Sequence, residues 1–168
     1  MASLWQQLLD FVDGLKNADP GTYLFSLLLL SAAAAVFLPI PIEPIVAVAP
    51  TDIPIVVVAI AVGLGKGLGA MAVYYIGTSI ESAILRFAQW GWFKWILDKS
   101  EKFVRRFGYV ALYIIMSIPL MVDTVPLYLF SLLNKEGKLL SVWGFTLVNV
   151  AAGFTRAMIV LLLRSFFI

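Results

Sequence analysis

Four ionisable residues lie within apolar stretches of this sequence, where a charged side chain is costly unless it is paired, solvated or used. Glu43 and Asp123 each come four residues after a proline, in the segments Pro39–Pro44 and Pro119–Pro126. Lys66 and Arg156 each fall in the long apolar stretch that follows one of these acids. Carboxylates at membrane depth can bind protons or cations, and a buried cation needs an acid, a carbonyl or water. These four residues are therefore predicted to form a transport or ion pathway, with Asp52 as a weaker fifth member.

A structural role is the alternative for each of these residues. Glu43 directly precedes a proline and Asp123 lies three residues before one, so either acid could cap a returning half-helix. The two cations could form structural ion pairs that hold the halves of the chain together, since buried pairs need not be functional. Asp52 falls at an expected span boundary, where capping explains it better than transport.

The composition indicates an integral membrane protein. Of 168 residues, 62% are hydrophobic and 13% are charged, whereas soluble domains have about half and a quarter. A bilayer core needs roughly 20 apolar residues per straight helix, so the chain has room for about four embedded elements. It has no cysteine or histidine, which excludes disulfides, cysteine metal sites, histidine proton shuttles and Ser-His nucleophiles. No metal, cofactor or enzymatic activity is expected, and a net charge of +2 does not indicate nucleic-acid binding.

Prolines divide the chain into the elements that must position these charges. An amphipathic interfacial helix is predicted within residues 1–21, followed by a single transmembrane domain over 22–168. Its first half, 22–80, contains a helix over 22–38, a turn, a short helix over 44–49 and a long span over 51–80. A basic, aromatic-rich connector over 81–106 is predicted on the cytoplasmic face. The second half, 107–168, contains a broken segment over 107–133, a polar turn and a last span over 139–163. The predicted breaks are at Pro39, Pro41, Pro44, Pro119 and Pro126.

Two topologies fit this all-α organisation. The broken segments could cross the bilayer as kinked helices, which gives four spans. They could instead be re-entrant, dipping to mid-membrane and returning on the same side. The distribution of Lys and Arg gives the same inside bias for both. The re-entrant version is preferred, because its halves then enter from opposite faces and form an inverted repeat, a common construction of transporters.

Four alternating glycines lie in the first long span, at Gly63, Gly65, Gly67 and Gly69. They make two overlapping small-xxx-small pairs, which allow close contact between helix backbones. They lack the spacing and the Ser/Thr of a phosphate-binding loop. Helix packing is therefore their predicted role.

These motifs resemble the DedA family, within the wider group that shares the VTT (SNARE-associated Golgi protein) domain. Pro39, Pro41 and Glu43 match the family's Pro-x-Pro-x-Glu type motif, and Tyr74 with Gly77 matches a Tyr-x-x-Gly that follows it. Ser117-Ile118-Pro119 stands where the family has an aromatic-Gly-Arg-x-x-Pro motif. The chain lacks the arginines of that motif, and Arg156 is a candidate substitute. The putative small multidrug export proteins, which pair an early Pro and Glu with a glycine-rich span, are a second resemblance.

The resemblance implies inverted re-entrant helices, with either proton-coupled transport or movement of phospholipids and polyprenyl-phosphate carriers between leaflets. The predicted function is a multi-pass transporter or lipid translocase of the plasma membrane. Its expected partners are membrane lipids, protons, a phospholipid or polyprenyl-phosphate substrate, and a second copy of the chain in a homodimer. Half-helix N-termini at mid-membrane favour an anionic group such as a phosphate. The alternatives are a non-transporting scaffold with structural ion pairs, a small multidrug exporter and an intramembrane aspartyl hydrolase.

Overall fold

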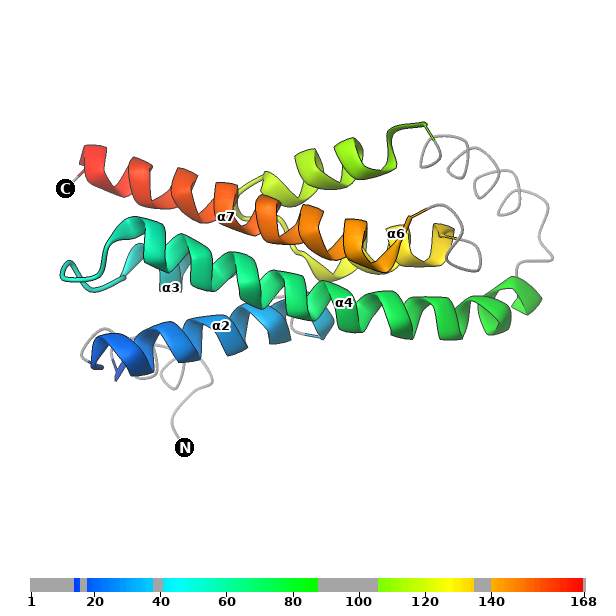
Figure 1. Cartoon of the computed structure of the whole chain (residues 1–168), viewed down its shortest axis with the longest axis horizontal. Coiled ribbons are helices and arrows are strands. Elements are labelled where there is room, and N and C mark those ends of the chain that lie inside the picture. Colours follow the sequence, from blue (N-terminus) through cyan, green and yellow to red (C-terminus); the bar gives the residue numbers. More distant parts are fainter. Residues whose placement is uncertain (1–13, 16–17, 38–40, 88–105, 135–139, 168) are drawn as a thin grey trace.

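A computed structural model describes residues 14–15, 18–37, 41–87, 106–134 and 140–167. Every regular element within these ranges is a helix, which confirms the all-α fold class (Figure 1). Most of the predicted interfacial helix, residues 88–105 of the basic connector, and Pro39 lie outside the described residues. The helices are α2 (Pro20–Val36), α3 (Glu43–Ala47), α4 (Ile55–Phe87), the helix Arg106–Ser117, α6 (Thr124–Leu133) and α7 (Val142–Phe167).

Two helices, α4 and α7, are long and apolar enough to cross a membrane. The apolar parts are Ile55–Gly77 and Val142–Phe166, with mean hydropathies of 2.1 and 1.8. At 1.5 Å per residue, each exceeds the ~30 Å thickness of a bilayer core. They run antiparallel and pack against each other along the centre of the molecule (Figure 1).

Two broken segments flank this central pair. Asp19 is the N-cap residue of α2, and its carboxylate accepts hydrogen bonds from the amide and the hydroxyl of Thr22. These hydrogen bonds lower the pKa of Asp19. The chain then turns back part-way along α4 and continues through α3 to the start of α4 (Figure 1). The helix Arg106–Ser117 approaches from the other end of the molecule, reverses, and returns through α6.

The helix boundaries correct two details of the expected organisation. The helix α4 continues through Phe87, so residues 81–87 belong to the long helix rather than to a separate connector. Pro126 lies in the first turn of α6 and Pro44 in the first turn of α3. The amides of a first turn have no intrahelical partner, so proline is tolerated there. These two prolines therefore lie inside helices, whereas Pro41 and Pro119 lie in the breaks.

The four glycines of α4 lie at its two principal contacts. A Cβ atom at Gly63 would lie 2.7 Å from the carbonyl oxygen of Val150 in α7, and one at Gly67 would overlap the Val150 side chain. On the opposite side of α4, Cβ atoms at Gly65 and Gly69 would collide with carbonyl oxygens of α2. The backbones of α7 and α2 thus approach α4 closely at these glycines, in the part of α4 that carries Lys66.

Large apolar side chains also cover much of the outer surface. Phe25, Leu68, Trp143 and Leu147 are each more than half exposed, although they belong to apolar helices. Contiguous apolar surface of this kind usually contacts a membrane or a partner. The exposed side of the helices is therefore suited to lipid contact.

Candidate functional site

Glu43, Lys66, Asp123 and Arg156 meet at one place in the interior. The guanidinium of Arg156 donates through Nε to Glu43 Oε1 and through Nη1 to Asp123 Oδ1, at 2.6 Å for the latter. Lys66 Nζ donates to the same Asp123 oxygen over 3.0 Å. Each residue comes from a different element, so the charged cluster joins α3, α4, α7 and the N-terminal end of α6.

The four side chains of the charged cluster are almost completely buried. Lys66 and Arg156 are 0% and 2% exposed, and Glu43 and Asp123 are 5% and 6% exposed. Two cations balance two carboxylates, so the four ionised groups sum to zero. Removing one partner of a buried pair typically costs about 3–5 kcal/mol, because the other charge stays buried without compensation. The members of the charged cluster therefore depend on one another.

The break after the helix Arg106–Ser117 supplies backbone groups to the charged cluster. In a continuous helix the carbonyl of Met116 would accept from the amide of Leu120. Here that carbonyl accepts from Lys66 Nζ at 3.3 Å, and the Leu120 amide donates to Glu43 Oε1 at 3.1 Å. The carbonyl and the amide that would pair in a continuous helix therefore bind a cation and an acid of the charged cluster instead.

The same turn holds Leu120 in a left-handed conformation. Its φ is 64°, the only positive value for a non-glycine residue in the described chain. This region costs an L-residue roughly 1–2 kcal/mol. Pro119 cannot continue the helix, and the reversal carries Met121 to a position where its carbonyl accepts from Arg156 Nη2 at 2.7 Å. Sequence reasoning did not identify these backbone contacts, although Pro119 signals that carbonyls and amides near it lose their helical partners.

The acids do not cap the helices that they begin. Glu43 is the first residue of α3, where the N-cap is Ile42 and makes no side-chain cap hydrogen bond. Asp123 is the N-cap residue of α6, but its side chain makes no cap bond either. Both carboxylates bind Arg156 instead. Neither carboxylate therefore makes the cap hydrogen bond that the capping alternative predicts.

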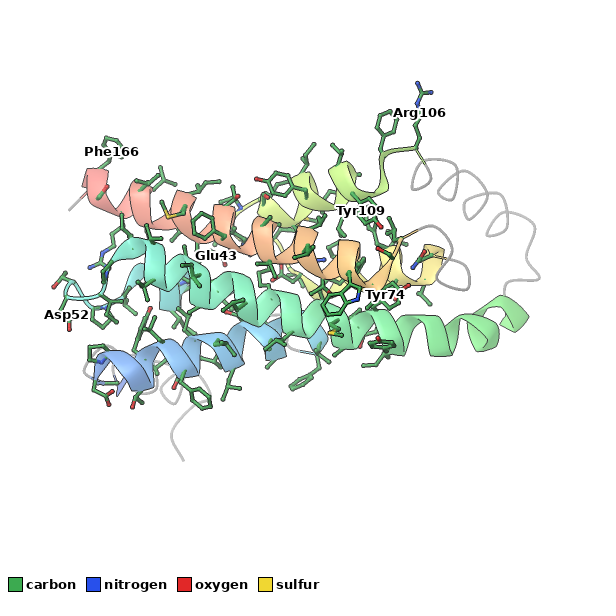
Figure 2. All side chains as sticks on the ribbon, viewed as in Figure 1. Glu43, Asp52, Tyr74, Arg106, Tyr109 and Phe166 are labelled. Carbon is green, nitrogen blue, oxygen red and sulfur yellow. The ribbon has the colours of Figure 1, made fainter. Side chains whose placement is uncertain are left out.

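One expected member lies apart from the others. Asp52 is exposed in the turn between α3 and α4, at the end of the molecule and away from Glu43 (Figure 2). Three polar residues near the site bind backbone carbonyls, as their most common role predicts: Asn149 to Phe145, Ser117 to Tyr113, and Thr124 to Ala34. Within the described residues, no group of three or more acidic, cysteine or histidine side chains could hold a metal ion.

One carboxylate oxygen of the charged cluster has no hydrogen-bond donor among the described residues. Glu43 Oε2 is buried, and it has no hydrogen-bond partner among the described residues, while Oε1 accepts from both Arg156 and Leu120. A buried acceptor without a donor is unfavourable for an ionised carboxylate. Glu43 Oε2 is therefore a buried acceptor that the other members of the charged cluster leave without a donor.

Comparisons with protein-family models, curated proteins and solved structures found no match to this chain. The resemblance to DedA proteins therefore stays a prediction based on the motif residues.

Proposed function

We propose that this protein is a multi-pass membrane transporter or lipid translocase, and that the charged cluster is its substrate site. The observation that carries the proposal is Arg156, which is buried between carboxylates from both broken segments. Ionisable side chains inside apolar helices are rare, and they typically mark pathways for ions, protons or substrates. The large apolar surface and the two helices able to cross a membrane support the placement in a bilayer.

The chain path supports an inverted repeat of re-entrant hairpins. Each broken segment reverses part-way along the long helices, and the two segments approach from opposite ends (Figure 1). Each is then followed by one long apolar helix, α4 or α7. In this proposal the reversals lie near the bilayer midplane, which is where transporters with such repeats place their sites.

The balance of charge suggests which substrate is carried. With Glu43 protonated, Lys66 and Arg156 exceed Asp123 by one positive charge, from the sum +2 − 1. A phosphodiester carries one negative charge, so binding a proton and a phosphodiester together leaves the charged cluster neutral. A guanidinium binds phosphate oxygens with the same forked geometry that it uses for carboxylates. We therefore propose a phosphate-bearing lipid or ion as the substrate, moved together with a proton that Glu43 carries.

The alternative is a non-transporting scaffold with structural ion pairs. The nearly complete burial of all four residues supports it, because a static ion-pair network would be buried in the same way. Flux in proteoliposomes separates the two functions. We expect purified protein to accelerate movement of a fluorescent phospholipid between leaflets, in a manner that depends on pH. Glu43→Gln should keep the helical fold but lose the pH dependence, while the exposed control Asp52→Asn should keep both.

The conservative variant Asp123→Asn should also lower flux. If the wild-type protein moves neither lipid nor protons, or if folded Glu43→Gln and Asp123→Asn proteins move them as fast as the wild type, the transport proposal is wrong. Circular dichroism and size-exclusion chromatography of each variant provide the check on folding.

A further inference from the structure

A cavity of about 390 Å³ lies at the end of the molecule where α4 begins and α7 ends. Its inner wall is apolar and includes Val58 and Leu161. Three polar side chains line it as well: Thr51, Arg164 and Ser165. Cavities that bind small molecules have a similar construction, with apolar walls and a few polar groups that fix the orientation of the ligand.

The cavity lies at the ends of both candidate membrane spans. One span starts at Ile55, which lines the cavity, and the other ends at Phe166, two residues after Arg164. In a bilayer the ends of such helices lie at the level of the lipid headgroups. The cavity would therefore open where headgroups and the first acyl carbons are found.

Arg164 gives this cavity a charge preference. Its Nη1 donates to the carbonyl of Ala49 at 2.7 Å, which holds the guanidinium beside the turn that leads to α4. The other donors of the guanidinium form no hydrogen bond within the described residues, and the side chain is partly exposed. Asp52 is an acid on the same turn, but it does not line the cavity. A fixed guanidinium with free donors matches the oxygens of a phosphate.

From these features we propose that the cavity is a binding site for an anionic phospholipid. The phosphate would bind Arg164, with the hydroxyls of Thr51 and Ser165 nearby. The first carbons of one acyl chain would lie against Val58 and Leu161. This site is separate from the charged cluster, which uses other residues. The inference requires the membrane location but not transport, so a negative flux result leaves it standing.

Native mass spectrometry of the detergent-solubilised full chain tests this proposal. The probes are phosphatidylglycerol and phosphatidylcholine with identical acyl chains. We expect the wild type to retain phosphatidylglycerol preferentially, and Arg164→Gln to lose roughly fivefold of that retention, the effect of one cation near an anionic lipid. Arg164→Lys should keep the preference. The matched control Arg106→Gln removes an exposed arginine from the helix at the opposite end and should change nothing.

A second variant keeps the test decisive if Arg164→Gln does not fold. Ser165→Phe retains the charge but places a large ring at the exposed rim of the cavity, and it should also lower retention. Equal retention of both lipids by the wild type would overturn the proposal, as would unchanged retention in folded Arg164→Gln or Ser165→Phe protein. Displacement of the lipid by an equal concentration of inorganic phosphate would overturn the role of the acyl chain.

Discussion

The ion pair between Lys66 and Asp123 gives a sharp test of the charged cluster. The perturbation is a double-mutant cycle with Lys66→Met, which keeps the length of the side chain, and Asp123→Asn, which keeps its shape. Asp123→Asn leaves the charged cluster with one excess positive charge, and Lys66→Met leaves it with one excess negative charge. The double variant restores neutrality, because Glu43 and Arg156 remain as a pair.

Burial sets the expected magnitude. The side chains of Lys66 and Asp123 are 0% and 5% exposed, so solvent cannot screen the charge that a single substitution leaves behind. Each single variant should therefore lose about 3–5 kcal/mol of stability. The double variant should lose clearly less than the sum of the two, by a coupling energy of about 1–3 kcal/mol, because neither residual charge lacks a partner.

The assay is reversible unfolding in mixed micelles, followed by far-ultraviolet circular dichroism for the wild type and the three variants. A matched pair of exposed residues, Asp52→Asn and Arg106→Gln, should each change the free energy of unfolding by less than about 0.5 kcal/mol. If the Lys66 and Asp123 substitutions add within about 0.5 kcal/mol, the two residues do not interact, and the geometry of the charged cluster is wrong.

Two further substitutions test the contacts that position the charged cluster. Gly65→Leu should lower the free energy of unfolding by about 3 kcal/mol or more, because the new side chain would collide with the backbone of α2. The control Ala72→Leu, on the exposed side of α4, should lower it by less than about 0.5 kcal/mol. Equal unfolding midpoints for the two variants would contradict the close packing of α2 against α4. Leu120→Gly should raise the free energy of unfolding by up to about 1 kcal/mol, because glycine tolerates a φ of 64° and keeps the amide that donates to Glu43. Leu120→Val should lower the free energy of unfolding, because a β-branched residue is disfavoured at this φ. A Gly variant less stable than the Val variant would show that the left-handed turn is not present.

The positions of the helices followed from proline and hydropathy. The sequence predicts a first helix over 22–38, and α2 covers Pro20–Val36; it predicts a short helix over 44–49, and α3 covers Glu43–Ala47. Proline is informative here because its effect is local: it removes one amide donor and blocks one carbonyl, wherever the rest of the chain lies. The same reasoning placed four ionisable residues in the interior, since few other charges interrupt the apolar stretches.

Partner choice depends on long-range geometry and could not be read from the sequence. Lys66 follows Glu43 along the chain, yet its ion pair is with Asp123 from the second broken segment, and Arg156 binds both acids. Spacing also left a capping role open for the acids, but neither side chain makes a cap hydrogen bond. A carboxylate at a helix start gains a modest amount from capping, whereas a buried guanidinium without a partner costs several times more, so the cation determines where the acids point.

The arrangement around Arg156 has a consequence for movement. Its guanidinium, carried by α7, binds Glu43 of the first broken segment and both Asp123 and the Met121 carbonyl of the second. Any motion that separates the two segments must therefore break at least one buried charged contact. That cost falls if a proton neutralises the departing carboxylate or if an anion replaces it, because then no charge is left without compensation. In the proposed transport, opening of the interior would therefore be energetically coupled to neutralisation of the charges in this cluster.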